Sequence, residues 1–231
     1  YILQNKTSIS NATYSIAIGW RWLINDETSL IVFHDSLLPK YRGFNPLVTA
    51  LINGDKKIGV TALKASKEYD RGDIIDQRMI EINYPIKISE VIDSISLEYA
   101  NLLNSIFKKL TSDNLKSYQQ DEDLVSYSLW RDDENYKIDW SLDANTIKRF
   151  IDAVGFPYRG AYSIIDNQKV VIRDSEVIND VEISIRETGK VIFKDNDSYT
   201  VVCGKGLLEV SDFYNKDGEQ VKFKKFRIRF K

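Results

Sequence analysis

The distribution of apolar and polar residues predicts both strands and helices in the first half of the chain. Three short apolar runs have a length typical of buried strands, and they cover 14–19, 29–33 and 58–63. A helix-like segment, 46–53, lies between the last two runs. From 89 to 113, apolar residues recur at three- and four-residue spacing, which predicts a long amphipathic helix with Ser89 as its N-cap. We therefore expect a helix-covered sheet over residues 1–113.

The second half of the chain has a different pattern. Residues 114–139 are polar and irregular with several aspartates, which is typical of a linker. Ser141 or Asp143 can cap a helix that runs to Val154. Beyond this helix, short alternating segments between turn signals predict a small antiparallel barrel, so that residues 140–231 form a second domain. The expected strands cover 162–165, 170–172, 181–185, 190–193, 199–203, 207–210 and 223–230.

Composition excludes several classes of protein. With 231 residues, 43% hydrophobic and 29% charged, the chain can bury a core, and no apolar run approaches the roughly 20 residues that span a bilayer. The start of the chain lacks the pattern of a signal peptide. Cys203 is the only cysteine, so no internal disulfide can form and we expect a cytoplasmic location.

Charge argues against a protein that binds polyanions over its whole surface, because the formal net charge is -2. The end of the chain, 222–231, nevertheless concentrates cations that alternate with apolar residues. We interpret it first as an edge strand with a solvated face and second as a nucleic-acid contact.

The candidate chemistry centres on His34, the only histidine of the chain. It stands where the apolar run 29–33 stops and a Ser-Leu-Leu-Pro turn begins, and open α/β sheets place their chemistry at such strand ends. A lone histidine beside a strand can equally be a packing residue. If the runs 29–33 and 58–63 are neighbouring parallel strands, the acidic loop after the second one opens at the same edge, and Asp70 then lies beside His34.

Four motifs follow one another in order: HDSLLPKYRG at 34–43, NGD at 53–55, GVT at 59–61 and DRGDII at 70–75. Together they resemble the catalytic domain of the formyltransferases that use 10-formyltetrahydrofolate. The resemblance continues in Ile-Asp-Trp at 138–140 and in PYRGA at 157–161, which are similar to segments of the methionyl-tRNA and arabinose-sugar enzymes. It therefore covers nearly the whole chain.

The resemblance implies an α/β fold with a Rossmann-like parallel-sheet formyltransferase domain over 1–113. The linker 114–139 and an OB-like β-barrel domain over 140–231 would follow. Family members carry a strand-helix-strand unit ahead of the point where this chain begins, so we expect the first βαβ unit to be missing.

The family's active site is an Asn-x-His pair at a strand end together with an aspartate from an Asp-x-Gly loop. Carried over by position, the catalytic residues are His34 and Asp70. The position of the asparagine is occupied by Val32, which has no amide to donate to a developing oxyanion. Asn45, just before the helix-like segment 46–53, is the candidate to replace that amide.

The resemblance also implies contacts to the substrates. A glycine-containing loop would read the pterin ring of the folate, although its tryptophans can equally be packing residues. Arg42 could clamp a carboxylate or phosphate of the substrate, or it could tie its own loop to an acidic neighbour. The expected cofactor contacts are Gly19, Arg21, Trp22, Leu23, Gly72 and Asp73, and the expected substrate contacts are Arg42 and Asn45.

The implied reaction transfers a formyl group from 10-formyltetrahydrofolate to a primary amine, without a metal. The near balance of acids and bases favours a nucleotide-linked amino sugar as acceptor, with methionyl-tRNA as the alternative. Two other interpretations stay open: hydrolysis of formyl-folate, and a non-catalytic protein that binds folate or a nucleotide sugar. The sequence also leaves open whether the protein forms a homodimer.

Overall fold

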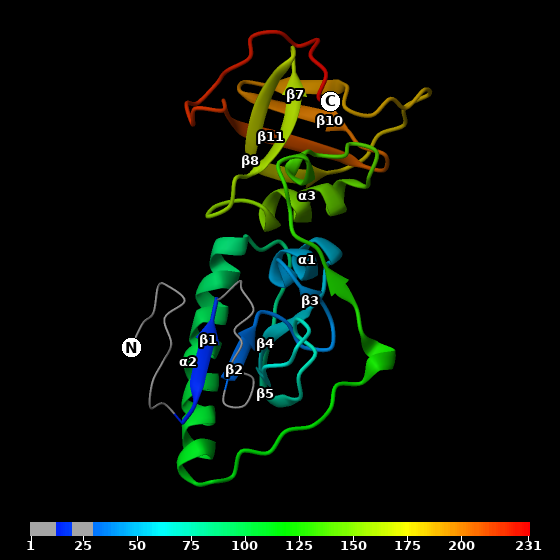
Figure 1. Ribbon diagram of the computed structural model, residues 1–231. Coiled ribbons are helices and arrows are strands. Elements are labelled where there is room, and N and C mark those ends of the chain that lie inside the picture. Colours follow the sequence, from blue (N-terminus) through cyan, green and yellow to red (C-terminus); the bar gives the residue numbers. More distant parts are fainter. Residues whose placement is uncertain (1–12, 20–29) are drawn as a thin grey trace. The chain divides into compact units, whose positions relative to one another are not determined.

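The computed structural model describes residues 13–19 and 30–231 (Figure 1). These residues form two compact units, each described separately below. The first unit comprises the described residues of 1–43 together with 59–79 and 97–127. The second unit comprises 44–58, 80–96 and 128–231.

The sheet of the first half is mixed, with the strand order β1-β2-β4-β5. Its strands are β1 Ser15–Ile18, β2 Leu30–His34, β4 Lys57–Lys64 and β5 Ile74–Glu81. β1 pairs with β2 in parallel, but β2 pairs with β4 antiparallel, with Val32 opposite Leu63 and His34 opposite Thr61. The predicted parallel pairing of the runs 29–33 and 58–63 is therefore wrong. An apolar run indicates a strand without its direction, which is set by the connection.

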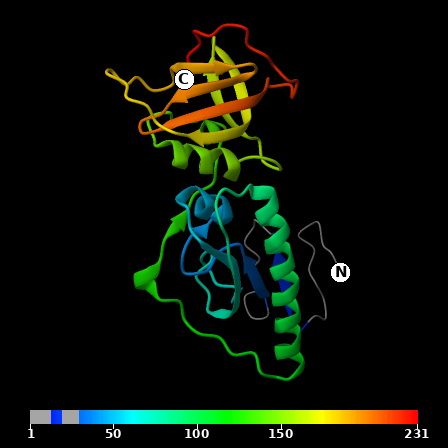
Figure 2. The same ribbon diagram turned by 180° about the vertical axis from the view of Figure 1, so that it is seen from behind.

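One face of this sheet packs against helix α2, Ile88–Thr111. Figure 2 shows the helix lying along the strands of the first unit. The buried cluster that joins sheet and helix consists of Ile31, Phe33, Val60, Ala62, Ile75, Leu102 and Ile106. The predicted helix over 89–113 is thus confirmed, but Ser89 lies inside it and is not its N-cap. Instead, Glu90 Oε1 accepts a hydrogen bond from Lys87 N at 3.2 Å, as in a capping box.

Two further helices have the predicted extents. α1, Pro46–Asn53, begins with the proline that fits the first turn of a helix. α3, Ala144–Ala153, is capped by Asp143, whose side chain accepts a hydrogen bond from Thr146 N at 3.0 Å. Within the second unit these helices are joined by Arg149, whose Nε donates to the carbonyl of Ile52 at 3.0 Å.

The second unit contains a five-stranded antiparallel sheet in the order β7-β8-β11-β10-β9. Its strands are β7 Ala161–Ile165, β8 Gln168–Ile178, β9 Val191–Asp195, β10 Ser198–Val202 and β11 Leu207–Tyr214. The predicted antiparallel β domain is confirmed, and its strands form a sheet that does not close into a full barrel. Backbone hydrogen bonds from the last residues reach both edges of this sheet: Phe230 N donates to Gly189 O, and Lys231 exchanges two hydrogen bonds with Ile164.

Two predicted strands do not form. Residues 181–185 are irregular, and two of their three apolar side chains, Val181 and Ile185, are exposed, so this segment does not cover a core as a strand would. The segment 223–230 is also not a strand, although its Ile228 and Phe230 are buried. The cation-rich end is therefore not the regular edge strand that the alternation predicted.

The segment predicted as a linker contains short regular elements. β3, Arg42–Gly43, pairs with β6, Tyr127–Ser128, in a two-stranded sheet. Two 3₁₀ turns cover Glu122–Leu124 and Glu134–Tyr136. No helix among the described residues is long and apolar enough to cross a membrane.

Candidate active site

His34 is the last residue of β2, and strand alternation decides which way it faces. Ile31 and Phe33 point into the cluster with α2. Val32 and His34 share the opposite face, where Val32 packs against Leu38, Leu63 and Ile74. The imidazole is buried, with 7% of the residue exposed. Its Nε2 lies 2.8 Å from the carbonyl oxygen of Tyr41.

Asp70 lies beside the other nitrogen of this ring. Its Oδ1 is 3.5 Å from His34 Nδ1, which is an ion-pair distance and longer than a direct hydrogen bond. Its Oδ2 accepts a hydrogen bond from Gly43 N at 2.8 Å. The backbone of Asp70 is left-handed, with φ 57°. The carboxylate is therefore held by the backbone that follows the Ser-Leu-Leu-Pro turn, and it faces the ring.

The structure thus brings His34 and Asp70 together in an antiparallel arrangement. In that arrangement, the loop after β4 must fold back to reach His34. Gly72 permits this, because a Cβ at its position would lie 1.7 Å from the carbonyl oxygen of Lys64. Lys64 N in turn donates to Asp73 O at 2.9 Å, and the Asp73 carboxylate accepts from Ser117 Oγ at 3.2 Å. In this geometry, Gly72 and Asp73 shape the loop that carries Asp70.

The turn after His34 is fixed by Thr61, a buried residue of the GVT motif whose role the motif did not reveal. Its hydroxyl donates to Ser36 O at 2.6 Å and accepts from Leu38 N at 3.1 Å. Gln77 Nε2 donates to the same hydroxyl at 2.7 Å and to Leu38 O at 2.9 Å. A threonine inside an apolar strand was the only signal of this role in the sequence.

We expect Thr61→Val to destabilise the protein by about 3 kcal/mol, because it leaves buried groups of Ser36, Leu38 and Gln77 without a partner while keeping the shape of the side chain. A shift of the denaturation midpoint, measured in urea, checks this. Thr111→Val, at the exposed end of α2, is the matched control and should change stability by less than about 0.5 kcal/mol. Equal midpoints for the two variants would contradict the role of Thr61.

Comparison with known proteins now identifies the family. The model of the formyl transferase domain matches residues 9–103, and that of the formyl transferase C-terminal domain matches residues 131–230. Methionyl-tRNA formyltransferase of Streptococcus mutans is 31% identical over 87% of this chain and 67% of that protein. The chain belongs to the formyl transferase family. The resemblance seen in the motifs is thereby confirmed.

Two further formyl transferases show the extent of the similarity. Methionyl-tRNA formyltransferase of Clostridium novyi is 35% identical over 79% of this chain and 58% of that protein. The structure of an N-formyltransferase from Helicobacter canadensis, in complex with folinic acid and dTDP-3-aminofucose, superimposes with a TM-score of 0.65. That similarity has 22% identity and covers 80% of this chain and 66% of the other. The chain spans 55% to 59% of the length of four curated relatives that it matches.

Three of the six expected cofactor contacts lie outside the described residues. Arg21, Trp22 and Leu23 belong to the segment 20–29, which lies outside them. Gly19 is described; it directly follows β1, is exposed and has φ 62°. Among residues 13–19 and 30–231, no cluster of three or more His, Cys, Asp or Glu side chains could hold a metal ion.

Arg42, one of the two expected substrate contacts, is buried with 1% of the residue exposed. Its guanidinium donates to Gln120 Oε1 at 2.8 and 3.0 Å and to both carboxylate oxygens of Glu122. This ion pair lowers the pKa of the exposed Glu122 carboxyl. The geometry matches the interpretation that Arg42 ties its loop to an acidic neighbour, and a contact of Arg42 with the substrate stays a prediction.

Asn45, the other expected substrate contact, belongs to the second unit. It precedes α1 with φ 49°, and its side chain makes no capping hydrogen bond. Because His34 belongs to the first unit, the role of Asn45 as a substitute for the family asparagine stays a prediction.

Asp35 is a titratable neighbour of the site that sequence reasoning missed. It follows His34 and accepts a hydrogen bond from the Tyr99 hydroxyl of α2. Desolvation by burial raises the pKa of the Asp35 carboxyl, and attraction to His34 only partly opposes this. A raised pKa in the folded state means that proton binding favours folding. That contribution is complete below the unfolded pKa of about 3.9 and is lost as pH rises through the folded value.

We therefore expect Asp35→Asn to stabilise the protein at pH 7, because it removes a carboxyl whose ionised form is disfavoured by burial. The advantage should fade as pH falls through the raised folded pKa and should be lost below about 3.9, where both side chains are neutral. Thermal melts between about pH 3.5 and 8 test this. Asp93→Asn, at an exposed position of α2, makes the same charge change and should show no such profile. An Asp35→Asn variant that is less stable than the parent at every pH would contradict the expectation.

Proposed function

We propose that this protein transfers a formyl group from 10-formyltetrahydrofolate to a primary amine. The proposal rests on one observation above all. In a chain of the formyl transferase family, the only histidine stands at the end of β2 with the carboxylate of Asp70 at 3.5 Å. The motifs predicted these two residues as the catalytic pair.

In this reaction the amine nitrogen bonds to the formyl carbon, and the bond from that carbon to the folate nitrogen breaks. The proton leaves the amine and ends on the folate nitrogen. His34 would donate a hydrogen bond to the formyl oxygen while negative charge develops there, and it would pass the proton. Asp70 would fix the ring and balance its charge. His34 Nε2 contacts the Tyr41 carbonyl in this structure, so a bound formyl group would share or replace that contact.

We propose a nucleotide-linked amino sugar as the acceptor. The formal charge of -2 gives the protein no overall attraction to a polyanion such as tRNA. The Helicobacter canadensis structure, which shares the fold, was solved with dTDP-3-aminofucose. Methionyl-tRNA is the second candidate, and it is favoured by the curated relatives with 31% and 35% identity, which are methionyl-tRNA formyltransferases.

A turnover assay with both acceptors tests the proposal. The protein is supplied with 10-formyltetrahydrofolate and either a panel of dTDP- and UDP-linked amino sugars or methionyl-tRNA, and release of tetrahydrofolate is followed. We expect release that depends on an amino sugar and is insensitive to moderate salt. Release that depends on methionyl-tRNA and falls steeply with salt would support the second candidate. Release without any amine would indicate hydrolysis, and binding of folate without release would indicate a non-catalytic protein.

A further inference from the structure

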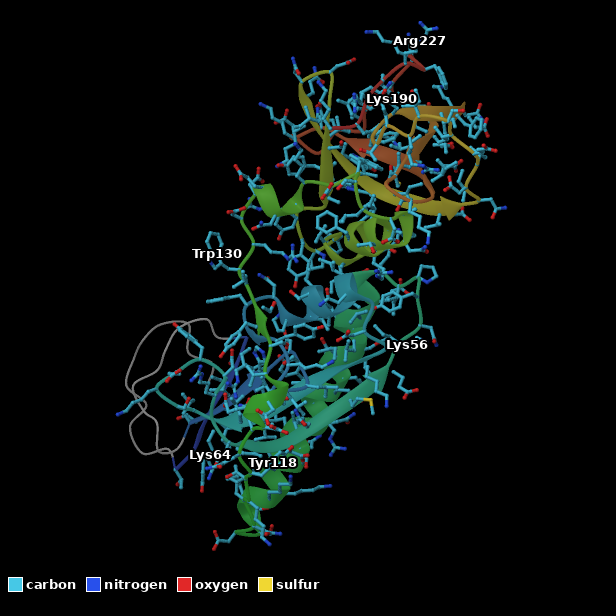
Figure 3. All side chains as sticks on the ribbon, turned by 90° about the vertical axis from the view of Figure 1, so that its right-hand side faces the viewer. Lys56, Lys64, Tyr118, Trp130, Lys190 and Arg227 are labelled. Carbon is cyan, nitrogen blue, oxygen red and sulfur yellow. The ribbon has the colours of Figure 1, made fainter. Side chains whose placement is uncertain are left out.

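The segment 117–127, which follows α2 and belongs to the first unit, is held against the other parts of that unit by a series of hydrogen bonds. Figures 1 and 2 both show it running beside the other elements of the first unit. Tyr118, labelled in Figure 3, exchanges two backbone hydrogen bonds with Ile74 at the start of β5. At the other end, Ser126 O accepts from Arg42 N at 2.9 Å, and Ser126 Oγ accepts from Tyr41 N at 3.0 Å.

Between these two attachments, the side chain of Gln120 joins two loops of the candidate site. One follows His34 and leads to Arg42, and the other follows β4 and contains Asp70. Its Nε2 donates to Asp70 O at 2.7 Å and to Gly72 O at 2.8 Å. Its Oε1 accepts both hydrogen bonds from Arg42. A primary amide has two donor hydrogens and two acceptor lone pairs, so all four are in use. The partners also fix the orientation of the amide, since carbonyls can only accept and a guanidinium can only donate.

These contacts form a closed cycle of hydrogen bonds and chain connections that includes Asp70. Asp70 Oδ2 accepts from Gly43 N, Gly43 follows Arg42, Arg42 donates to Gln120, and Gln120 donates back to Asp70 O. The left-handed backbone of Asp70 costs about 1 kcal/mol or more and persists only where its surroundings enforce it. Gln120 supplies that enforcement from a distant part of the sequence.

We propose that Gln120 is a positioning residue, which holds the Asp70 loop so that the carboxylate faces His34. The inference rests on the proposed function for its catalytic meaning. Its geometric part stands independently, because it concerns only the placement of Asp70 against His34. Gln120 does not touch the ring, so it acts through Asp70.

Gln120→Glu separates this role from simple packing. The carboxylate keeps the shape of the side chain and the acceptor for Arg42, but it replaces the donor to Asp70 O and Gly72 O by an oxygen that repels both. Gln119→Glu is the matched control, since it makes the same charge change at the exposed neighbouring residue. Glu122→Gln provides a milder second variant, which weakens the hold on Arg42 and leaves Gln120 in place.

The first measurement is the NMR spectrum of the His34 ring, which is unambiguous because the chain has one histidine. In folded Gln120→Glu we expect the ring signals to move in the same direction as in Asp70→Asn. In Glu122→Gln they should move less, and in Gln119→Glu they should stay in place. Unchanged ring signals in Gln120→Glu would overturn the proposal. Should Gln120→Glu not fold, unchanged signals in Glu122→Gln would overturn it.

The second measurement is turnover. We expect Gln120→Glu to lower kcat by about 10- to 100-fold with the KM of the amine unchanged, because a displaced catalytic group affects the chemical step. In the Asp70→Asn background, the same change should cost less than about twofold, since the residue through which it acts is already lost. Equal losses in both backgrounds would overturn the positioning role. A parent protein without formyl transfer would refute the proposed function, while the NMR result would still decide the geometric part.

Discussion

His34→Ala is expected to lower the rate of formyl transfer by about 10²- to 10⁴-fold, which is the range that general acid-base catalysis contributes. The His34 imidazole faces the Asp70 carboxylate, and it lies at the end of β2, where the Ser-Leu-Leu-Pro turn begins. The loss should appear in kcat, because the ring acts on the developing oxyanion and on the proton. The measurement is release of tetrahydrofolate at saturating amine.

Stability needs its own control in this experiment, because His34 is buried and bonded to the Tyr41 carbonyl. His34→Gln keeps an amide nitrogen near the position of Nε2 that can donate to that carbonyl, and it should fold like the parent while losing activity as His34→Ala does. If His34→Gln and His34→Ala both turn over within about threefold of the parent, His34 is a packing residue and the proposed mechanism is wrong.

The sequence predicted the regular elements that periodicity and capping define locally. The helix 46–53 has the expected ends, since Pro46 begins it and the chain turns at Gly54. Asp143 caps α3 as expected. The motifs also predict that Asp70 lies near His34, although the strands β2 and β4 that precede the two residues pair antiparallel and not in parallel.

The remaining features depend on contacts between distant residues, which a local pattern does not carry. The direction of β4 relative to β2 is one such feature. A strand that pairs antiparallel, as His34 does with Thr61, has the same apolar pattern in the sequence as a strand that pairs in parallel. The roles of Thr61 and Gln120 are others, since each binds residues far away in the sequence. Alternation over 181–185 predicted a strand, but without a neighbouring strand to pair with it gave an irregular segment.

Val32→Asn is expected to raise the rate of formyl transfer by about 10- to 100-fold. Val32 lies two residues before His34 on the same face of β2, so an amide there stands beside the ring and can donate to the same oxyanion. One such donor typically contributes about 10²- to 10³-fold to kcat, and we expect less because the surroundings of Val32 are built for an apolar side chain.

This gain should come with a loss of stability of about 1 to 3 kcal/mol, because the amide enters the cluster of Leu38, Leu63 and Ile74 without a partner while no substrate is bound. Val32→Ala is the control, since it loses the same packing and gains no donor. Its rate should not exceed that of the parent. The gain of Val32→Asn should also vanish in the His34→Ala background if both groups act on one oxyanion. A Val32→Asn variant that folds and turns over no faster than the parent would show that the site already has another donor, and the residues to examine next would then be Asn45 and the backbone N–H groups of the turn 36–40.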